Sequence, residues 1–481
     1  MSPSIILSVF IIYTCIIFII TYVTSRKADQ LSFFLGNKTS PWYVVAYGMI
    51  GASLSGITFM SIPGWVSDTQ FSYMVVVFGY LVGYFAIAKI LLPLYYRLNL
   101  TSIYTYLEQR FGFWTYKTGA VFFLLSRTMG ASLRMFVVVN VLQVFVFDAW
   151  GIPFWVNVSM FIILIILYTV KGGIKTIIWT DTLQTTCMIL AVILSIGFIS
   201  KEIHMDLGTL LSTIRHSHAS QVFIMDWHSK RYFIKQFLSG IFIAIVMTGL
   251  DQEMMQKNLS CRNLKDAQTN MFSFSGSLLF ANLMFLILGA TLLIYADRLG
   301  IHVASTDNLF PTIALKFLSP LAGLVFLIGL ISAAYPSADG ALTSLTTSFC
   351  IDILNFNKTE NLSVHQKKRI RYAVHIGIAL ILWVIIILFR TINDKAIIDK
   401  LFTIAGYTYG PILGFFSFGL FTKWQVKDLW IPLIALFSPV ICYIISVHSQ
   451  TWLHGYIFGF ELLIFNGMLT FAGMMIVRKA N

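Results

Sequence analysis

Charged residues are scarce in this chain of 481 residues. Asp, Glu, Lys and Arg make up 11% of it, against roughly 25% in an average soluble domain. Hydrophobic residues make up 58%, and the mean hydropathy is +0.81. There are too few polar residues to cover a core of that size, so the composition excludes an ordinary soluble protein. It indicates an all-α polytopic membrane protein whose main contact is the lipid bilayer.

Cysteine and catalytic motifs are also lacking. The five cysteines lie far apart without metal-like spacing, so we expect free thiols. The chain has no His-Glu-x-x-His, no Walker loop and no Gly-x-Ser-x-Gly, and nothing in it predicts an enzyme. The net charge of +13 does not indicate nucleic acid binding, because membrane topology gathers Lys and Arg in short loops.

The apolar runs predict about thirteen transmembrane helices in a single membrane domain, 1–481. The first run, 5–24, lacks a basic region before it and a small-residue cleavage site after it, so we expect a retained leading helix. The predicted helices are 5–24, 43–68, 74–95, 119–146, 153–170, 176–200, 233–256, 271–296, 321–350, 371–390, 401–421, 429–448 and 455–477.

Lysine and arginine are concentrated in the loops on one side, including 26–38, 97–117 and 358–371. Because such loops stay in the cytoplasm, and an odd number of helices separates the termini, we expect the N terminus outside and the C terminus inside.

Two predicted helices carry weak points, a Gly- and Ser-rich stretch at 48–58 and a second at 247–252. Interrupted helices in corresponding positions of two repeats are a pointer to a transporter's binding site. They would begin two inverted five-helix repeats, 43–200 and 233–421, leaving two trailing helices in 429–477. Ordinary close packing of small residues is the alternative.

The run 321–350 contains polar residues that are costly in a bilayer. Asp339 is a functional-site candidate by default, and Pro336 frees the carbonyl of Ser332 from its helical hydrogen bond. A cation bound by that carbonyl, the Ser337 hydroxyl and a carbonyl near Ala333 would explain the pattern. A simple proline kink would also explain it.

Arg127 and Arg134 are seven residues apart, so they share one face of a helix. A guanidinium at membrane depth needs an anion or several carbonyls. The partner is either a protein carboxylate, at Asp181, Asp251 or Asp339, or a substrate carboxylate that Arg134 binds with both of its terminal nitrogens. Side chains that could serve substrate hydroxyls are Thr58, Asn140 and Gln252.

Several motifs, in order from residue 33 to about 421, resemble the sodium:solute symporter family. They are 33–36 before 41–42, 51–55, 168–173 running to 179–184, 251–252 with 256–259, 337–339 to Asp352, and 407–411 with Gly414. The resemblance implies an inverted-repeat fold like that of the leucine transporter, with an extra leading helix, and coupling of uptake to the sodium gradient.

The resemblance also implies ion ligands. The family's main sodium site would comprise carbonyls of Gly51 and Leu54 with three positions of the 321–350 helix, Ala333, Pro336 and Ser337. Serine is usual in the family at position 336, so the Ser332 carbonyl is the proposed substitute there.

Some family members bind a second sodium, which would lie here between Asp181 and the positions of Asp339 and Gly340. One of those positions is a carboxylate in this chain, where the family has a hydroxyl. Two nearby carboxylates repel, which would either raise the pKa of one of them or recruit a cation between them.

These features together predict a sodium-coupled symporter of a small polar organic solute, working by alternating access as a monomer in a bacterial inner membrane. A carboxylated sugar such as a sialic acid would suit Arg134, as it does family members that carry acidic sugars. The alternatives are a symporter of a neutral sugar or polyol, a proton-coupled carrier using Asp181 or Asp339, and a substrate sensor on the same scaffold.

Overall fold

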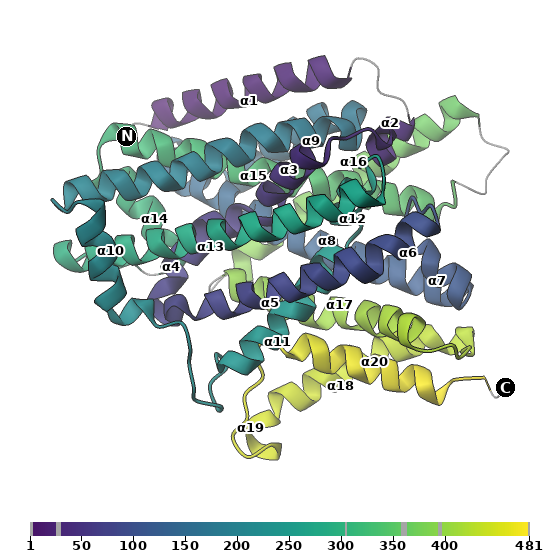
Figure 1. The fold of residues 1–481 in the computed structure, drawn as a ribbon. Helices are drawn as coiled ribbons and strands as arrows, with labels where there is room; N and C mark the ends of the chain where they lie inside the picture. Colours follow the sequence, from purple (N-terminus) through teal and green to yellow (C-terminus); the bar gives the residue numbers. More distant parts are fainter. Residues whose placement is uncertain (1–2, 26–29, 304, 357–362, 393–396, 480–481) are drawn as a thin grey trace.

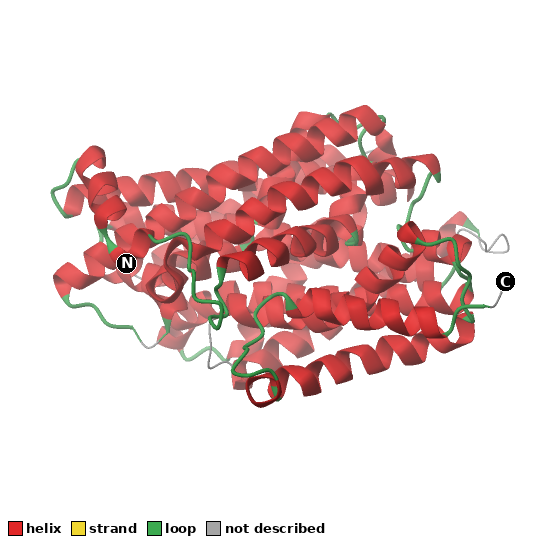
Figure 2. Ribbon diagram, turned by 60° about the horizontal axis from the view of Figure 1, so that its bottom comes forward, coloured by secondary structure: helices red, strands yellow, loops and turns green. Residues whose placement is uncertain are grey.

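A computed structural model describes residues 3–25, 30–303, 305–356, 363–392 and 397–479. The regular elements in these ranges are all helices, which run roughly parallel in one bundle (Figures 1 and 2). Helices suit a bilayer because they satisfy their own backbone hydrogen bonds. In the first half of the chain the α-helices are α1 Pro3–Ser25, α2 Gln30–Leu35, α3 Trp42–Ser53, α4 Gly56–Thr69, α5 Tyr73–Ala86, α6 Leu92–Arg97, α7 Thr105–Arg110, α8 Phe113–Leu142, α9 Phe154–Glu202 and α10 Leu207–His216.

The second half continues the same pattern. Its α-helices are α11 Phe233–Ala244, α12 Gln252–Leu259, α13 Leu264–Leu299, α14 Leu309–Thr312, α15 Pro320–Ser348, α16 Val364–Ile392, α17 Ile397–Phe421, α18 Ile431–Val447, α19 Ser449–Trp452 and α20 Leu462–Ile476. The trailing α18 and α20 pack together beside α17, on the opposite side of the bundle from α1 (Figure 1).

Within the described ranges, nine helices are long and apolar enough to cross a membrane, or ten if α11 and α12 form one bent span. Two shorter apolar helices are Phe154–Val170 and Leu462–Ile476. The sequence predicted helix from 455 onward, but the final helix begins only at Leu462, after an irregular stretch in which Gly455 has φ +86°. The chain is therefore an integral membrane protein with multiple spans.

Both predicted interruptions are confirmed. The first helix breaks between α3 and α4, where Leu54 has ψ 63° and Ser55 is extended. The second bends by 64° between Gly249 and Gln252. Tyrosine hydroxyls accompany this second break, since Tyr95 donates to the carbonyl of Gly249 at 2.9 Å and Tyr104 to that of Leu250 at 2.7 Å. Such partners allow non-helical backbone at membrane depth.

The segments predicted as 153–170 and 176–200 form one element, α9, which is interrupted at Gly173. The φ of this residue is +55°, and a Cβ there would lie 2.4 Å from the Cα of Phe33. Only glycine fits this close approach without strain. By contrast, α15 continues as a helix through Pro336.

The leading helix α1 packs along α9 and α15 (Figure 1). Tyr13 accepts a hydrogen bond at 2.8 Å from Ser332, and Thr14 shares one at 2.7 Å with Tyr335. These bonds join α1 to the same stretch of α15 that the sequence singled out.

Candidate functional site

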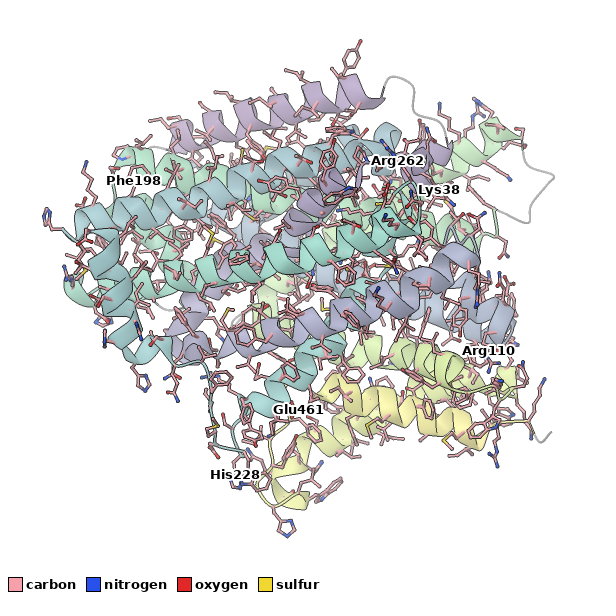
Figure 3. All side chains as sticks on the ribbon, viewed as in Figure 1. Lys38, Arg110, Phe198, His228, Arg262 and Glu461 are labelled. Carbon is pink, nitrogen blue, oxygen red and sulfur yellow. The ribbon has the colours of Figure 1, made fainter. Side chains whose placement is uncertain are left out.

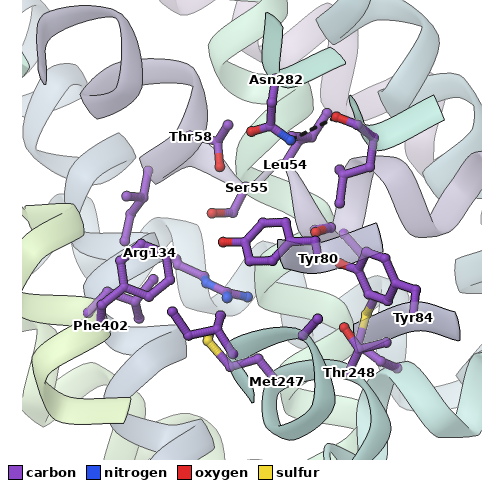
Figure 4. Close-up of a pocket in the computed structure, with 18 of the residues that line it drawn as sticks. Leu54, Ser55, Thr58, Tyr80, Tyr84, Arg134, Met247, Thr248, Asn282 and Phe402 are labelled. Carbon is purple, nitrogen blue, oxygen red and sulfur yellow. Dashed lines mark hydrogen bonds between the residues drawn. The ribbon is translucent and has the colours of Figure 1, made fainter. Parts of the chain in front are cut away.

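A cavity of about 70 Å³ lies beside the break between α3 and α4. Its walls come from α3, α4, α5, α8, α11, α12, α13 and α17, which places it inside the bundle. Figure 4 shows the guanidinium of Arg134 pointing into it, with Ser55, Thr58 and Tyr80 nearby. The lining residues are Ala52, Ser53, Leu54, Ser55, Ile57, Thr58, Tyr73, Tyr80, Tyr84, Arg127, Arg134, Ile243, Ala244, Met247, Thr248, Met254, Leu278, Asn282, Leu401 and Phe402.

Arg127 and Arg134 are the charged residues of this lining, and they differ in their partners. Arg127 forms a buried ion pair with Glu253 through Nη2, and its Nη1 lies 3.8 Å from Oδ2 of Asp251. Arg134 is 8% exposed. In the described part of the chain its guanidinium forms no hydrogen bond or ion pair, and its Nε is buried without a partner. An unpaired buried guanidinium is costly, so Arg134 is the group in this cavity that most needs an anion.

The other residues predicted to bind substrate divide into two groups. Thr58 lines the cavity, whereas Asn140 and Gln252 do not. Gln252 is fully buried and already bonded, because its amide donates to the carbonyl of Thr101 at 2.8 Å and accepts from the N–H of Ile103 at 3.0 Å. The structure therefore brings Thr58 and Arg134 together and leaves the two amides apart from them.

The residues predicted for the main sodium site lie at the C-terminal end of α3 and on α15, and both α3 and α4 pack against α15. A Cβ on Gly56, the first residue of α4, would lie 3.9 Å from the carbonyl oxygen of Ala333. The Ser337 Oγ is buried and has no hydrogen-bond partner among the described residues. Gly51 is in close contact with α9, where Thr185 Oγ1 is likewise buried and unpartnered.

Buried hydroxyl oxygens usually have partners, and each exception calls for an explanation. Thr185 Oγ1 lies beside Gly51 near the end of α3, Ser337 Oγ lies on α15, which packs against α3, and oxygen atoms are the ligands that hard cations prefer. The donor set therefore fits sodium. The hydroxyl of Ser332 is bonded elsewhere, since its Oγ lies 2.8 Å from the hydroxyl of Tyr13 and 2.6 Å from the carbonyl oxygen of Ile328.

The residues predicted for a second cation have partners that the sequence did not reveal. Asp181 bonds to the ammonium of Lys257 at 2.7 Å, and Asp339 accepts from Tyr168 at 2.9 Å. Gly340 packs against the carboxylate of Glu253.

Glu253 and Lys257 are functional candidates that sequence reasoning missed. They lie four residues apart on α12, so they share one face of that helix, and their charged atoms are 3.5 Å apart. Their spacing in the sequence, an acidic and a basic residue four positions apart directly after the break at Asp251, could have indicated this pair. Tyr409 adds a hydrogen bond of 2.7 Å to Asp251.

Comparison with solved structures places this architecture among known transporters. A sodium-coupled sialic acid symporter, in a substrate-bound, outward-open state, superposes with a TM-score of 0.83 at 20% identity, covering 99% of both chains. MHP1, a nucleobase-cation-symport-1 family transporter in a closed conformation, gives 0.56 at 13% identity, covering 92% of this chain and 94% of that one. The fold is therefore that of the leucine-transporter-like membrane proteins.

The family model for the sodium:solute symporter family matches residues 33–427. The chain belongs to this family, and it is a sodium-coupled solute symporter rather than an enzyme. The sodium/sialic acid symporter SiaT of Proteus mirabilis (strain HI4320) is 25% identical over 418 residues, which cover 84% of this chain and 81% of that protein. Sodium and a small solute are the partners that the family implies.

Proposed function

We propose that this protein imports a small polar solute bearing a carboxylate, such as a sialic acid, together with sodium. The observation that carries the proposal is Arg134, a buried guanidinium that faces the cavity and has no partner among the residues that the structure describes. Its planar fork suits a carboxylate, which it would bind through two parallel hydrogen bonds. Thr58 and Ser55, which also line the cavity, offer hydroxyls for the polar groups of a sugar.

Sodium would bind at the main site, held by the carbonyls of Gly51, Leu54 and Ala333 and by the hydroxyl of Ser337. The carbonyl of Ser332, freed by Pro336, would complete the set. Because the site joins the α3–α4 break to α15, a bound ion would hold the cavity wall in the arrangement that receives substrate. The membrane potential supplies roughly 2.3 kcal/mol per charge per 100 mV.

The topology proposed with this function has thirteen spans, with α3 to α9 and α11 to α17 as two inverted repeats between one leading and two trailing helices. The protein would work as a monomer in a bacterial inner membrane. Support for the orientation comes from Figure 3, in which Lys38, Arg110 and Arg262 lie at the end of the bundle where the chain finishes, and His228 lies away from it. Basic residues at that end favour a cytoplasmic C terminus.

Uptake of radiolabelled sialic acid into proteoliposomes tests the proposal. An inward sodium gradient should drive accumulation above the external concentration, and dissipating that gradient should abolish it. Uptake driven by a pH gradient without sodium would favour the proton-coupled alternative. Sodium-driven uptake of a neutral sugar or polyol, with sialic acid inactive, would exclude the carboxylated substrate.

Ser337→Ala tests the main sodium site. The variant removes one oxygen ligand but no recorded hydrogen bond, so we expect the sodium concentration for half-maximal uptake to rise severalfold while the protein remains folded. Ser344→Ala is the matched control on the same helix, because its hydroxyl is bonded to the carbonyl of Ala341 at 3.0 Å, and the sodium dependence should stay unchanged. Equal sodium dependence in Ser337→Ala and the wild type would remove Ser337 from the site.

A further inference from the structure

Lys257 places a positive charge inside the bundle. Its side chain is 1% exposed, and it projects from α12 towards α9. Its Nζ lies 2.7 Å from Oδ2 of Asp181 and 3.5 Å from Oε1 of Glu253. The ammonium is therefore held between two carboxylates that are themselves fully buried.

Glu253 occupies the space in front of Gly340. A Cβ on that glycine would lie 2.3 Å from Oε1 of Glu253 and 2.6 Å from its Cδ. A side chain carrying a hydroxyl ligand at position 340 would therefore collide with the carboxylate that helps to hold Lys257. The bare glycine and the Glu253–Lys257 pair fit one another.

Asp339 faces a different neighbour. Its Oδ2 accepts a hydrogen bond from Tyr168 on α9, and within the described ranges no cationic side chain lies within 4.0 Å of it. Asp181 and Asp339 are therefore not bridged to one another, and each has its own partner. The cation that Asp181 requires is already supplied by the chain.

We propose that the ammonium of Lys257 takes the place of a second sodium ion, so that the protein binds one sodium, at the main site. This inference rests on the proposed sodium-coupled function. A buried, ionised carboxylate needs a counter-charge. An ammonium that belongs to the chain provides one throughout the transport cycle without being transported. A mobile sodium ion at Asp181 would have to displace the Lys257 ammonium from that carboxylate. The buried ammonium would then have only Glu253, which already pairs with Arg127, and this is unfavourable.

Equilibrium binding of radioactive sodium to the purified full-length protein, without substrate, tests the proposal. The wild type should bind one sodium ion per chain. Lys257→Met removes the ammonium while keeping most of the side-chain volume, so Asp181 should recruit a second sodium ion and the number should rise to two. Lys257→Met/Asp181→Asn, which removes both charges, should bind one, as should Lys257→Arg.

Two outcomes would overturn the proposal. They are two sodium ions bound by the wild type with one lost in Asp181→Asn, or a single ion bound by a folded Lys257→Met protein. Binding of the ion at the main site serves as the internal control for folding. Ser337→Ala should weaken the binding of that ion alone. If Lys257→Met does not fold, Asp181→Asn decides, because its number of bound ions should equal that of the wild type. A wild type that binds no sodium would instead contradict the proposed function itself.

Discussion

Replacing Arg134 with lysine is expected to weaken the binding of sialic acid at least tenfold, and replacing it with alanine should weaken it further. Each hydrogen bond between charged groups contributes roughly 1.5 to 3 kcal/mol, and lysine keeps the charge but loses the paired geometry. The measurement is the ligand-induced shift in melting temperature at saturating sodium, titrated with sialic acid for each variant.

The methyl ester of sialic acid is the matched control ligand, because it keeps the sugar and loses the negative charge. Its weaker binding should be nearly the same in the wild type and in Arg134→Ala. Sodium binding without substrate should also change little. If Arg134→Ala instead damaged expression, and neutralising Asp181, Asp251 or Asp339 rescued it, Arg134 would be a structural ion-pair partner. A neutral sugar or polyol would then be the better substrate.

Replacing Arg127 with methionine should destabilise the fold rather than weaken substrate binding alone. Arg127 neutralises Glu253 and lies 3.8 Å from Asp251, and all three side chains are buried. Removing one partner from a buried ion pair typically costs about 3–5 kcal/mol, because the other charge stays in a low-dielectric interior. The free energy of unfolding, measured in detergent by chemical denaturation, should fall by an amount of this order.

Arg134→Met provides the matched control. It makes the same chemical change on the same helix, at a residue that has no partner within the described ranges. Its free energy of unfolding should stay near that of the wild type or rise. Arg127→Met/Glu253→Gln should recover part of the loss, and the double-mutant cycle should show a coupling between the two residues. Equal stability of Arg127→Met and Arg134→Met would contradict the ion-pair assignment.

The two arginines show where sequence reasoning reached its limit. Their spacing correctly placed both on one face of a helix, and it left two roles open for Arg134, a salt bridge or a substrate contact. In the structure the salt bridges belong to Arg127. One partner is Asp251, which was among the carboxylates considered, and the nearer one is Glu253, 126 residues away in the chain. Glu253 was not among the carboxylates considered, because helical periodicity shows which residues of one helix share a face but not which face of another helix they meet.

The sequence by itself determined the class of protein, the helical segments and the positions of the two interrupted helices. These properties depend on local chemistry, since apolar runs of sufficient length must form helices in a bilayer and glycine and proline weaken a helix where they occur. Only the tertiary structure decided that Lys257 pairs with Asp181 across 76 residues, that Gln252 is bonded away from the cavity and that Arg134 is left to face it. Each of these outcomes depends on which side chains meet when separate helices pack, and in a buried interior the nearest opposite charge determines the partner of each ionised group.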